Sequence, residues 1–454
     1  MSSKFIEMGE PTPIVINPDF EGWVKPDDLA RFVVEIIDQL DLTEFEEQYS
    51  NTGSPAYPPR IMLALLFYCY ISGIFSSRKI SKGTYEIIPV IYITKGLRPH
   101  YTIIADFRKR FLNELEGVFT QVVQIATAMG VSKLGDVTLD GTKVKANASK
   151  HKALSYDYAC KLEAQIKEEI ATLMKKSEEA NTASINNIDI PDELKRREDR
   201  LKIIESAKAE IEARKKIRLE IEKAEYDRKI EERKQKELER GRKLGGRKPK
   251  EPTESPSSSD QVNLTDPESR IMPKPGGWFE QSYNTQASVD ADSMLILGNH
   301  VSQNPNDKKE LEPALNELDD LPDSVGKIER VAADNGYKSE GNLKLAKKRN
   351  VEIYVPSGRQ KHNQKLDDMF SPEPTSPKNP TLSEALEYRM KTKAGKAFYA
   401  VRKSTIEPVF GIIKEVMGFK KFSLRGIESV TGEWNLVCIA YNIKRLRVLN
   451  LGKA

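Results

Sequence analysis

The chain has 454 residues, of which 38% are hydrophobic and 31% are charged, so its length predicts two to four domains at about 150 residues each. Its three cysteines and four histidines are widely scattered, which excludes a disulfide-bonded secreted scaffold and a Cys- or His-rich metal site. The beginning of the sequence lacks a signal-peptide pattern, and the longest apolar run, 61–74, is shorter than the roughly 20 residues of a membrane span. We therefore expect a cytoplasmic protein with no membrane partner.

The small net charge of +4 hides an uneven distribution. Residues 389–454 carry 14 Lys and Arg against 4 Glu, whereas the rest of the chain is slightly acidic. A basic C-terminal region favours a polyanionic partner such as nucleic acid. The alternative is an ordinary solvent-exposed face of charged side chains.

The first 132 residues have helical patterns. An amphipathic stretch at 29–42 precedes a run at 61–75 that is apolar on all sides and predicts a buried helix. A Ser-capped helix begins at 76–81, and a single long helix is predicted over 102–130, because apolar residues recur every four positions. Residues 1–132 are thus predicted to form a helical domain.

The pattern changes to strands at Leu134. The segment DVTLDGTKVKANAS alternates in polarity and predicts a strand, a turn at Asp140-Gly141 and a second strand. Further segments with strand or helix patterns follow in the order strand 281–290, strand 293–303, helix 307–321, strand 327–336, helix 339–349, strand 351–357 and helices 411–418 and 433–449. This order predicts an α/β fold, a mixed sheet flanked by helices.

The sheet region is interrupted between residues 151 and 275. Residues 156–243 are rich in Glu, Lys, Arg and Ala and have two narrow apolar stripes, which predicts a coiled-coil helical hairpin over 151–243. A Pro/Ser-rich linker is predicted over 244–275. The sheet domain would then be split into 133–150 and 276–454, although two separate domains are an alternative. The hairpin is either a solvated coiled coil or a surface through which two copies pair.

Two carboxylates have a context that favours a catalytic site. Asp140 and Asp334 each follow an apolar strand and precede a Gly-containing turn, the position at which open sheets place their sites. If the two strands are neighbours, the carboxylates face each other and suit Mg²⁺, which prefers carboxylate and phosphate oxygens. Either Asp could instead simply form a turn.

Glu407 is the candidate third carboxylate. Lys403 and Lys414 lie four residues before it and seven after it, close to the same helical face, as expected for a site that holds metal and DNA phosphate. Ser404 to Glu407 also has the spacing of a helix capping box, so Glu407 could cap a helix as well.

Several motifs in fixed order resemble those of bacterial insertion-sequence DDE transposases. They are VTLDGTKVKANAS, NLTDPESRIM, YNTQASVD, ADNGY, TIEPVFGIIK with GFKKFSLRG, and EWNLVCIAYNIKRL. The N-terminal segments YPPRIMLALLFYCYISGIFSSRKI and YTIIADFRKRF resemble the InsH-like domain of the same transposases. The resemblance extends over about residues 55–450.

The resemblance implies an RNase H-like catalytic domain in which Asp140, Asp334 and Glu407 bind two Mg²⁺ ions, with Mn²⁺ as a possible substitute. A tyrosine, arginine, glutamate and lysine signature maps onto Tyr399, Arg402, Glu407 and Lys414, except that four residues rather than three separate Arg402 from Glu407. Lys403 could therefore take the phosphate-binding role of Arg402.

The resemblance also implies the reaction and its partners. Water activated by the metal ions would cut transposon ends, and the freed 3′-hydroxyl would attack target DNA. We expect double-stranded DNA as partner, a homodimer assembled on DNA, and association with the nucleoid. The alternatives are a metal-dependent nuclease that joins no strands and an inactive DNA-binding relic.

The helical N-terminal domain is expected to bind the transposon end. The candidate contacts are basic residues on two of its helices, namely Arg78, Lys79, Arg108, Lys109 and Arg110. A solvent-exposed helix face is an equal alternative for them. Trp434, in the last helical segment, is expected to pack in the core.

Overall fold

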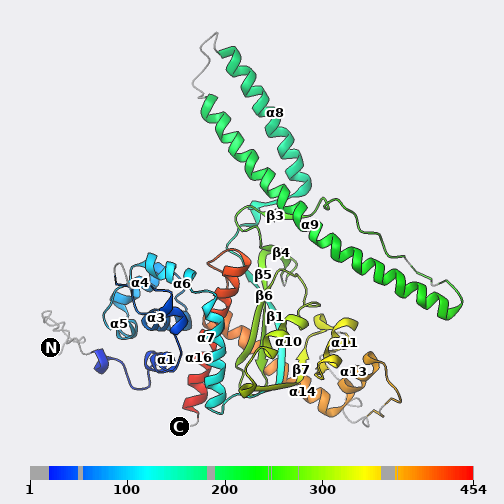
Figure 1. The fold of residues 1–454 in the computed structure, drawn as a ribbon. Helices are drawn as coiled ribbons and strands as arrows, with labels where there is room; N and C mark the ends of the chain where they lie inside the picture. The colour runs from blue at the N-terminus through cyan, green and yellow to red at the C-terminus, as the bar shows by residue number, and fades with distance from the viewer. Residues whose placement is uncertain are drawn as a thin grey trace, which may run out of the picture.

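In the computed structural model the chain forms a helical N-terminal part, a central mixed sheet and a long helical arm (Figure 1). The structure describes residues 20–49, 55–180, 190–243, 245–246, 248–274, 276–358, 374–375 and 377–452. Within these residues, no helix is both long and apolar enough to cross a membrane.

The N-terminal part consists of short helices that pack around a buried central one. α3 (Pro59–Ile71) is buried along most of its length, as its uniformly apolar sequence predicts. The other elements of this part are η1 (Phe20–Trp23), α1 (Leu29–Ile37), α2 (Thr43–Glu47), α4 (Ser77–Glu86), α5 (Ile88–Thr94), α6 (Tyr101–Arg110) and α7 (Glu114–Ala128).

The long helix expected over 102–130 is two helices. α6 ends at Arg110, and residues 111–113 form a turn before α7 begins. Phe111, at the C-terminal cap of α6, is buried and packs on Phe45, with ring centroids 5.0 Å apart, and on Phe107, at 4.7 Å. Phe111 is buried at the break between the two helices. The four-residue apolar repeat therefore continues through the break, and it does not indicate where α6 ends.

The sheet has the strand order β4-β5-β1-β7-β8, with β6 paired to β5 as well. The strands are β1 (Leu134–Lys145), β4 (Arg270–Pro273), β5 (Phe279–Asp290), β6 (Ile296–Ser302), β7 (Gly326–Ala333) and β8 (Glu352–Tyr354). β1 pairs antiparallel with β5 and parallel with β7, and β7 pairs parallel with β8. The expected mixed sheet flanked by helices is confirmed, and its strand directions are consistent with an RNase H-like domain.

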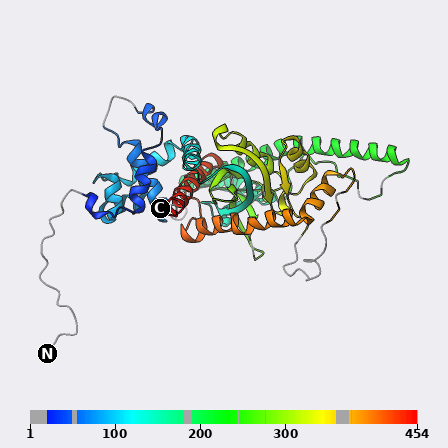
Figure 2. The ribbon, with the colours of Figure 1, turned by 90° about the horizontal axis from the view of Figure 1, so that it is seen from below.

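Helices cover the sheet and join it to the N-terminal part (Figures 1 and 2). α16 (Ile427–Leu451) packs against α7, α3 and β6, and Trp434 is fully buried in it, as expected. α14 (Lys393–Ser404) and α15 (Ile406–Gly411) contact β1. The remaining elements are α10 (Leu311–Asp319), η3 (Asp323–Val325), η4 (Asn335–Tyr337), α11 (Glu340–Lys348), α13 (Leu382–Lys391) and η5 (Ile412–Val416).

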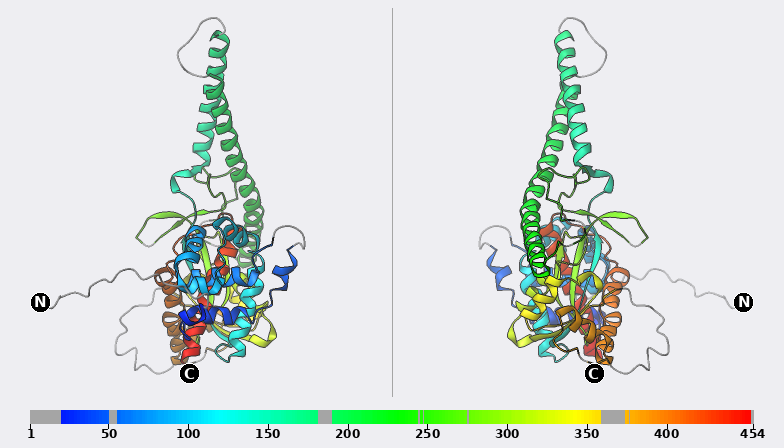
Figure 3. Two further views of the ribbon diagram at one scale, coloured as in Figure 1. Left: turned by 90° about the vertical axis from the view of Figure 1, so that its left-hand side faces the viewer. Right: turned by 90° about the vertical axis from the view of Figure 1, so that its right-hand side faces the viewer.

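The helical arm projects away from the body of the molecule (Figure 3). α8 (Tyr156–Ala180) packs against the first half of α9 (Ile190–Arg240) around a small core of its own, formed mainly by Ile166, Ile204 and Ile211. The apolar stripe expected on the second half of α9 is not covered by α8, because Ile217 and Ile221 are 65% and 51% exposed. The paired part of the hairpin is therefore shorter than the sequence pattern indicates.

The segment expected to be a linker over 244–275 contains two strands. β3 (Gln261–Asn263) pairs with β2 (Ala153–Ser155) at the base of the arm, just after η2 (Lys150–Lys152), and β4 joins the main sheet. Asp266, between them, is fully buried and accepts a hydrogen bond from the Tyr283 hydroxyl at 2.9 Å. The Pro/Ser-rich composition ends near residue 260, and the residues after it belong to the sheets.

Candidate active site

Asp140 and Asp334 lie side by side at the end of a parallel ladder. The last paired residues of β1 and β7 are Leu139 and Ala333, and each carboxylate is on the next residue. Asp334 Oδ1 accepts a hydrogen bond from the amide of Gly336 at 2.7 Å, so Asp334 both forms the turn that its sequence indicates and stands in the site. The two strands are neighbours, as the catalytic interpretation requires.

Asp140-Gly141 is not a turn, which corrects the expected strand–turn–strand pattern. β1 continues to Lys145 and stays paired with β5, with Gly141 opposite Gln286. A Cβ atom on Gly141 would lie 2.0 Å from Gln286 Nε2, so the glycine is needed here for close approach rather than for chain reversal. Asp140 is therefore held in the middle of a long strand.

Glu407 lies in the first turn of α15 and is 53% exposed on its side chain. The preceding Thr405 is buried, and its hydroxyl lies 3.0 Å from the Thr138 hydroxyl of β1, which fixes the start of α15 against the sheet. The capping box expected over 404–407 does not form, because no side chain caps α15 and the Ser404 hydroxyl donates to the Val401 carbonyl. Glu407 is thus not engaged as a helix cap.

Arg402 links two of the three carboxylates. Its Nη2 donates to Asp140 Oδ2 at 2.6 Å, and its Nη1 lies 3.4 Å from Glu407 Oε1. The Arg402 side chain is 12% exposed, whereas Lys403 is exposed. The extra residue between Arg402 and Glu407 therefore does not prevent Arg402 from reaching the site, and a phosphate contact by the exposed Lys403 stays a prediction.

The site holds Asp140 in an unusual electrostatic environment. Burial raises the pKa of Asp140 to about 6; the Arg402 guanidinium opposes this change and the charge of Asp334 reinforces it. A bound cation would stabilise the charged form of a carboxylate that is buried beside a second carboxylate.

Lys414 and Tyr399 border the same carboxylates. Lys414 lies on the π-helical turn η5; its Nζ donates to the Thr142 hydroxyl and lies 3.5 Å from the Lys143 carbonyl oxygen. Burial and the charge of Lys274 lower the pKa of Lys414 to about 8. Tyr399 is half-buried on α14, and burial raises its pKa.

The N-terminal basic residues divide into one buried and four exposed side chains. Arg108 is 7% exposed and donates to the Tyr70 hydroxyl at 2.9 Å and the Phe75 carbonyl at 3.0 Å. The prediction that Arg108 contacts DNA is therefore wrong, because its guanidinium is used inside the protein. The exposed residues are Arg78, Lys79, Lys109 and Arg110.

A fourth carboxylate, Asp307, lies in the site and was not predicted from the sequence. Its Oδ1 accepts hydrogen bonds from Asn284 Nδ2 and Gln286 Nε2, both at 2.7 Å, and lies 3.6 Å from Lys143 Nζ. Asn284 and Gln286 are alternate residues of β5, so their side chains lie on the same face of the strand. This spacing was the sequence signal that could have indicated a polar surface there. Asp307 lies in the loop before α10, whereas the sequence pattern places it at the beginning of a helix over 307–321, so that pattern did not indicate a role in the site.

The carboxylates suit a divalent cation once Arg402 is displaced. Among the described residues, no three Asp, Glu, His or Cys side chains stand ready to hold a metal ion. The Arg402 guanidinium occupies the space between Asp140 and Glu407 instead, as a positive charge among carboxylate oxygens. Oxygen donors of this kind are those that Mg²⁺ and Mn²⁺ prefer.

Comparison with known protein families gives two matches. A family model described as a transposase DDE domain matches residues 257–443, which include Asp334 and Glu407 but not Asp140, on the far side of the arm. A second model, described as a transposase domain (DUF772), matches residues 18–110. Searches of curated proteins and of solved structures found no match. The two family matches, in this order and over more than half of the chain, show that the chain belongs to the insertion-sequence DDE transposases.

Proposed function

We propose that this transposase cleaves the ends of an insertion sequence and joins them to target DNA at a single site formed by Asp140, Asp334 and Glu407. The observation that carries the proposal is the adjacency of Asp140 and Asp334 beyond the last β1–β7 pair, with Arg402 connecting Asp140 to Glu407. Three carboxylates from distant parts of the chain have little reason to converge in a structural role, since their mutual repulsion costs stability.

In this proposal Asp140, Asp334 and Glu407 hold two Mg²⁺ ions, and Mn²⁺ can replace them. Bound there, a divalent ion would supply Lewis-acid polarisation of the scissile phosphate and would lower the pKa of the attacking water or 3′-hydroxyl. Arg402 leaves the carboxylates and turns to the DNA phosphate, to which its planar guanidinium can donate two hydrogen bonds. The Arg402–Asp140 ion pair is thus replaced by contacts of Asp140 with the metal ions and of Arg402 with the DNA.

Lys414 and Tyr399 would bind the DNA strand beside the reacting phosphate. Lys414 Nζ already lies over the Thr142–Lys143 segment of β1, two to three residues beyond Asp140. A low pKa in a half-buried lysine reflects the cost of keeping the charge without a counter-ion, and a phosphate provides one. Tyr399 would donate its hydroxyl to a phosphate or sugar oxygen.

Conservative variants of the carboxylates test the proposal. Asp140→Asn, Asp334→Asn and Glu407→Gln should each reduce cleavage of DNA carrying the element's ends by about a thousandfold, while the affinity for that DNA stays near the wild-type value. Asp292→Asn, a change at an exposed carboxylate, is the matched control. Wild-type cleavage by any one of the three variants would remove that residue from the site.

Strand joining separates a transposase reaction from simple hydrolysis. A pre-cleaved end with a free 3′-hydroxyl should be joined covalently to a supercoiled plasmid in the presence of Mg²⁺. Cleavage without joined product would favour the nuclease alternative. Neither activity, in a folded protein that binds DNA, would favour an inactive relic.

We further propose that two copies assemble on DNA and that the arm contributes to their pairing. The second half of α9 presents Ile217 and Ile221 to solvent beyond the segment covered by α8. Exposed apolar residues repeated on a helix favour a helical partner. Sedimentation of the full chain with DNA should give a dimer, and Ile217→Ser with Ile221→Ser should shift it toward monomer.

A further inference from the structure

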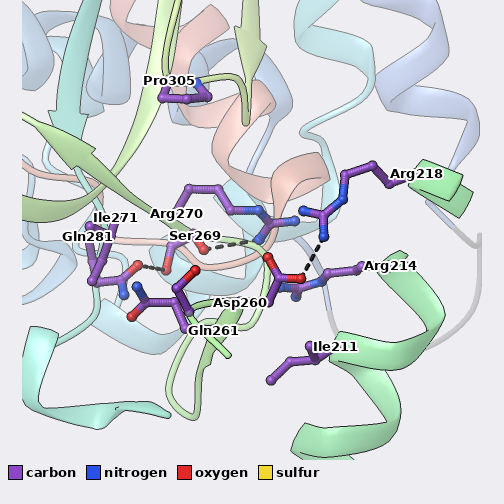
Figure 4. Close-up of a pocket in the computed structure, with 11 residues that line it drawn as sticks. Ile211, Arg214, Arg218, Asp260, Gln261, Ser269, Arg270, Ile271, Gln281 and Pro305 are labelled. Carbon is purple, nitrogen blue, oxygen red and sulfur yellow. Dashed lines mark hydrogen bonds and ion pairs between the residues drawn. The ribbon is translucent and has the colours of Figure 1, made fainter. Parts of the chain in front are cut away.

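A second basic site lies where the arm meets the sheet. A pocket of about 360 Å³ opens between α9, the β3–β4 segment and the beginning of β5 (Figure 4). Three arginines line it, Arg214 and Arg218 from α9 and Arg270 from β4, and the carboxylate among the lining residues is Asp260. The lining residues thus include three guanidinium groups and one carboxylate.

Arg270 is held in the pocket by groups that carry no charge. Its Nη1 donates to the carbonyls of Pro267, Glu268 and Ser269 at 2.9 to 3.0 Å, and its Nη2 donates to Gln303 Oε1 at 2.9 Å. Among the described residues no carboxylate forms an ion pair with Arg270. The charges of Glu210 and Glu268 favour the charged form of Arg270 without forming an ion pair, and an anionic ligand would further offset the cost of its burial.

The other two arginines are paired with carboxylates, so Arg270 is the arginine of the pocket that forms no ion pair among the described residues. Arg214 Nε pairs with Glu210 at 2.8 Å, Arg218 Nη2 pairs with Asp260 at 2.6 Å, and Arg218 Nε lies 3.3 Å from Glu222. Burial and the charge of Arg214 lower the pKa of Arg270 to about 10, as expected where the two guanidinium groups repel each other. Ser269 and Gln281 add buried polar groups to the wall.

The pocket is connected to the active site by two short paths. Pro305 lines the pocket, and Asp307, two residues later, accepts a hydrogen bond from Gln286, the β5 residue opposite Gly141. Along β5, Arg270 is opposite Ser282 and Asp140 is opposite Ala287. The two positions are thus offset by about 17 Å along β5, and β4 and β1 lie on opposite sides of β5.

We propose that the Arg214–Arg218–Arg270 pocket binds a backbone phosphate of the DNA whose cleavage takes place at Asp140. This inference rests on the proposed function, since it takes the ligand to be the transposase's own DNA. A planar guanidinium cluster suits a phosphate, which accepts paired hydrogen bonds. The phosphate would also fix the base of the arm relative to the catalytic sheet, because α9 and β4 would both hold it.

The salt dependence of DNA binding tests the proposal. Affinity of the full chain for a short labelled DNA duplex of arbitrary sequence would be measured by fluorescence anisotropy between about 50 and 200 mM salt. Arg270→Gln and the double variant Arg214→Gln/Arg218→Gln should each bind about tenfold more weakly and reduce the log–log salt slope by about one unit. Arg270→Lys, which keeps the charge, should retain the wild-type slope.

The matched control is Arg196→Gln, an exposed arginine near the beginning of the same helix, which should leave the affinity and the slope unchanged. Wild-type slopes in both glutamine variants would overturn the proposal. Because Arg270 also holds the 267–269 backbone, the Arg214/Arg218 variant keeps the test valid if Arg270→Gln does not fold.

The response to inorganic phosphate and the behaviour of the wild type distinguish failure of this inference from failure of the proposed function. If inorganic phosphate raises the Tm of the wild type but not of the variants, while the duplex slopes do not differ, the pocket binds a small phosphate and the DNA proposal is wrong. If the wild type neither binds nor cleaves DNA, the proposed function fails; if it does both and the pocket variants bind equally well, this inference alone fails.

Discussion

The guanidinium of Arg402 donates to Asp140 at 2.6 Å and lies 3.4 Å from Glu407, in the space that a divalent cation would share with these carboxylates. Arg402 and the cation therefore compete for the same oxygens. The position of Arg402 sets how readily the DNA-free protein takes up metal.

Replacing Arg402 should strengthen metal binding in the absence of DNA. Arg402→Gln removes a charged competitor from Asp140, so the affinity for Mn²⁺ should rise about tenfold, in line with the strength of a charge-assisted hydrogen bond. Isothermal titration calorimetry on the DNA-free protein gives the affinity directly. Lys403→Gln, a change at the adjacent exposed cation, should have no effect, and unchanged or weaker binding in Arg402→Gln would show that Arg402 does not compete.

The raised pKa of Asp140 predicts a pH-dependent stability of the metal-free protein. Its ordinary pKa of 3.8 rises to about 6 in the fold, so the folded state binds a proton between these values that the unfolded chain does not. The contribution of Asp140 is fully present below pH 4 and is lost as the pH rises through 6, a change of about 3 kcal/mol. The difference in unfolding free energy between wild type and Asp140→Asn, followed by urea unfolding in chelator, should change by this amount. A difference that stays constant with pH, like that expected for Asp292→Asn, would contradict the prediction.

Lys414 should make DNA binding sensitive to alkaline pH. Its pKa of about 8 means that the amine loses its charge between pH 7 and 9 in the free protein. Affinity for a DNA duplex should fall by up to about tenfold over this range, because a neutral amine no longer attracts phosphate. Lys414→Met should bind more weakly at pH 7 and lose this pH dependence, whereas Lys403→Met should retain it. An equal decline in Lys414→Met would assign the titration to another group.

Adjacent basic residues on α6 should have opposite roles. Arg108→Ala removes two buried hydrogen bonds and leaves the Tyr70 hydroxyl without its partner, so stability should fall by about 2 to 3 kcal/mol. Lys109→Ala should change stability by less than about 0.5 kcal/mol, because Lys109 is exposed. Thermal unfolding and DNA binding of both variants provide the comparison. A stable Arg108→Ala protein with weakened DNA binding would restore Arg108 as a DNA contact.

The order of elements and the two aspartates were predictable because they depend on local patterns. Apolar strands followed by Asp334-Asn-Gly and the uniformly apolar α3 carry their structure in neighbouring residues. The misassigned turn at Asp140-Gly141 arose because glycine favours turns as well as close approach, and only the opposing Gln286 shows which applies. Arg108 was misassigned because its burial depends on Tyr70 and Phe75, more than thirty residues away.

The same reasoning explains why Asp307 and the arginine pocket were not found. Both are formed where a loop or an arm returns to the sheet, so their partners are distant in the sequence. The break between α6 and α7 has a similar origin, since the four-residue repeat is kept while the helix axis changes.

The arm leaves and re-enters the body through one pair of strands, in which Ser155 of β2 is paired with Gln261 of β3. For the main sheet, the segment between these residues is an insertion whose two ends are held together, although α9 also contacts the body through the Glu225–Lys309 ion pair. Doubling the length of such a loop adds only about 0.6 kcal/mol of closure entropy. Evolution could therefore lengthen, trim or exchange this segment as an interchangeable module while Asp140 and Asp334 kept their places in the sheet.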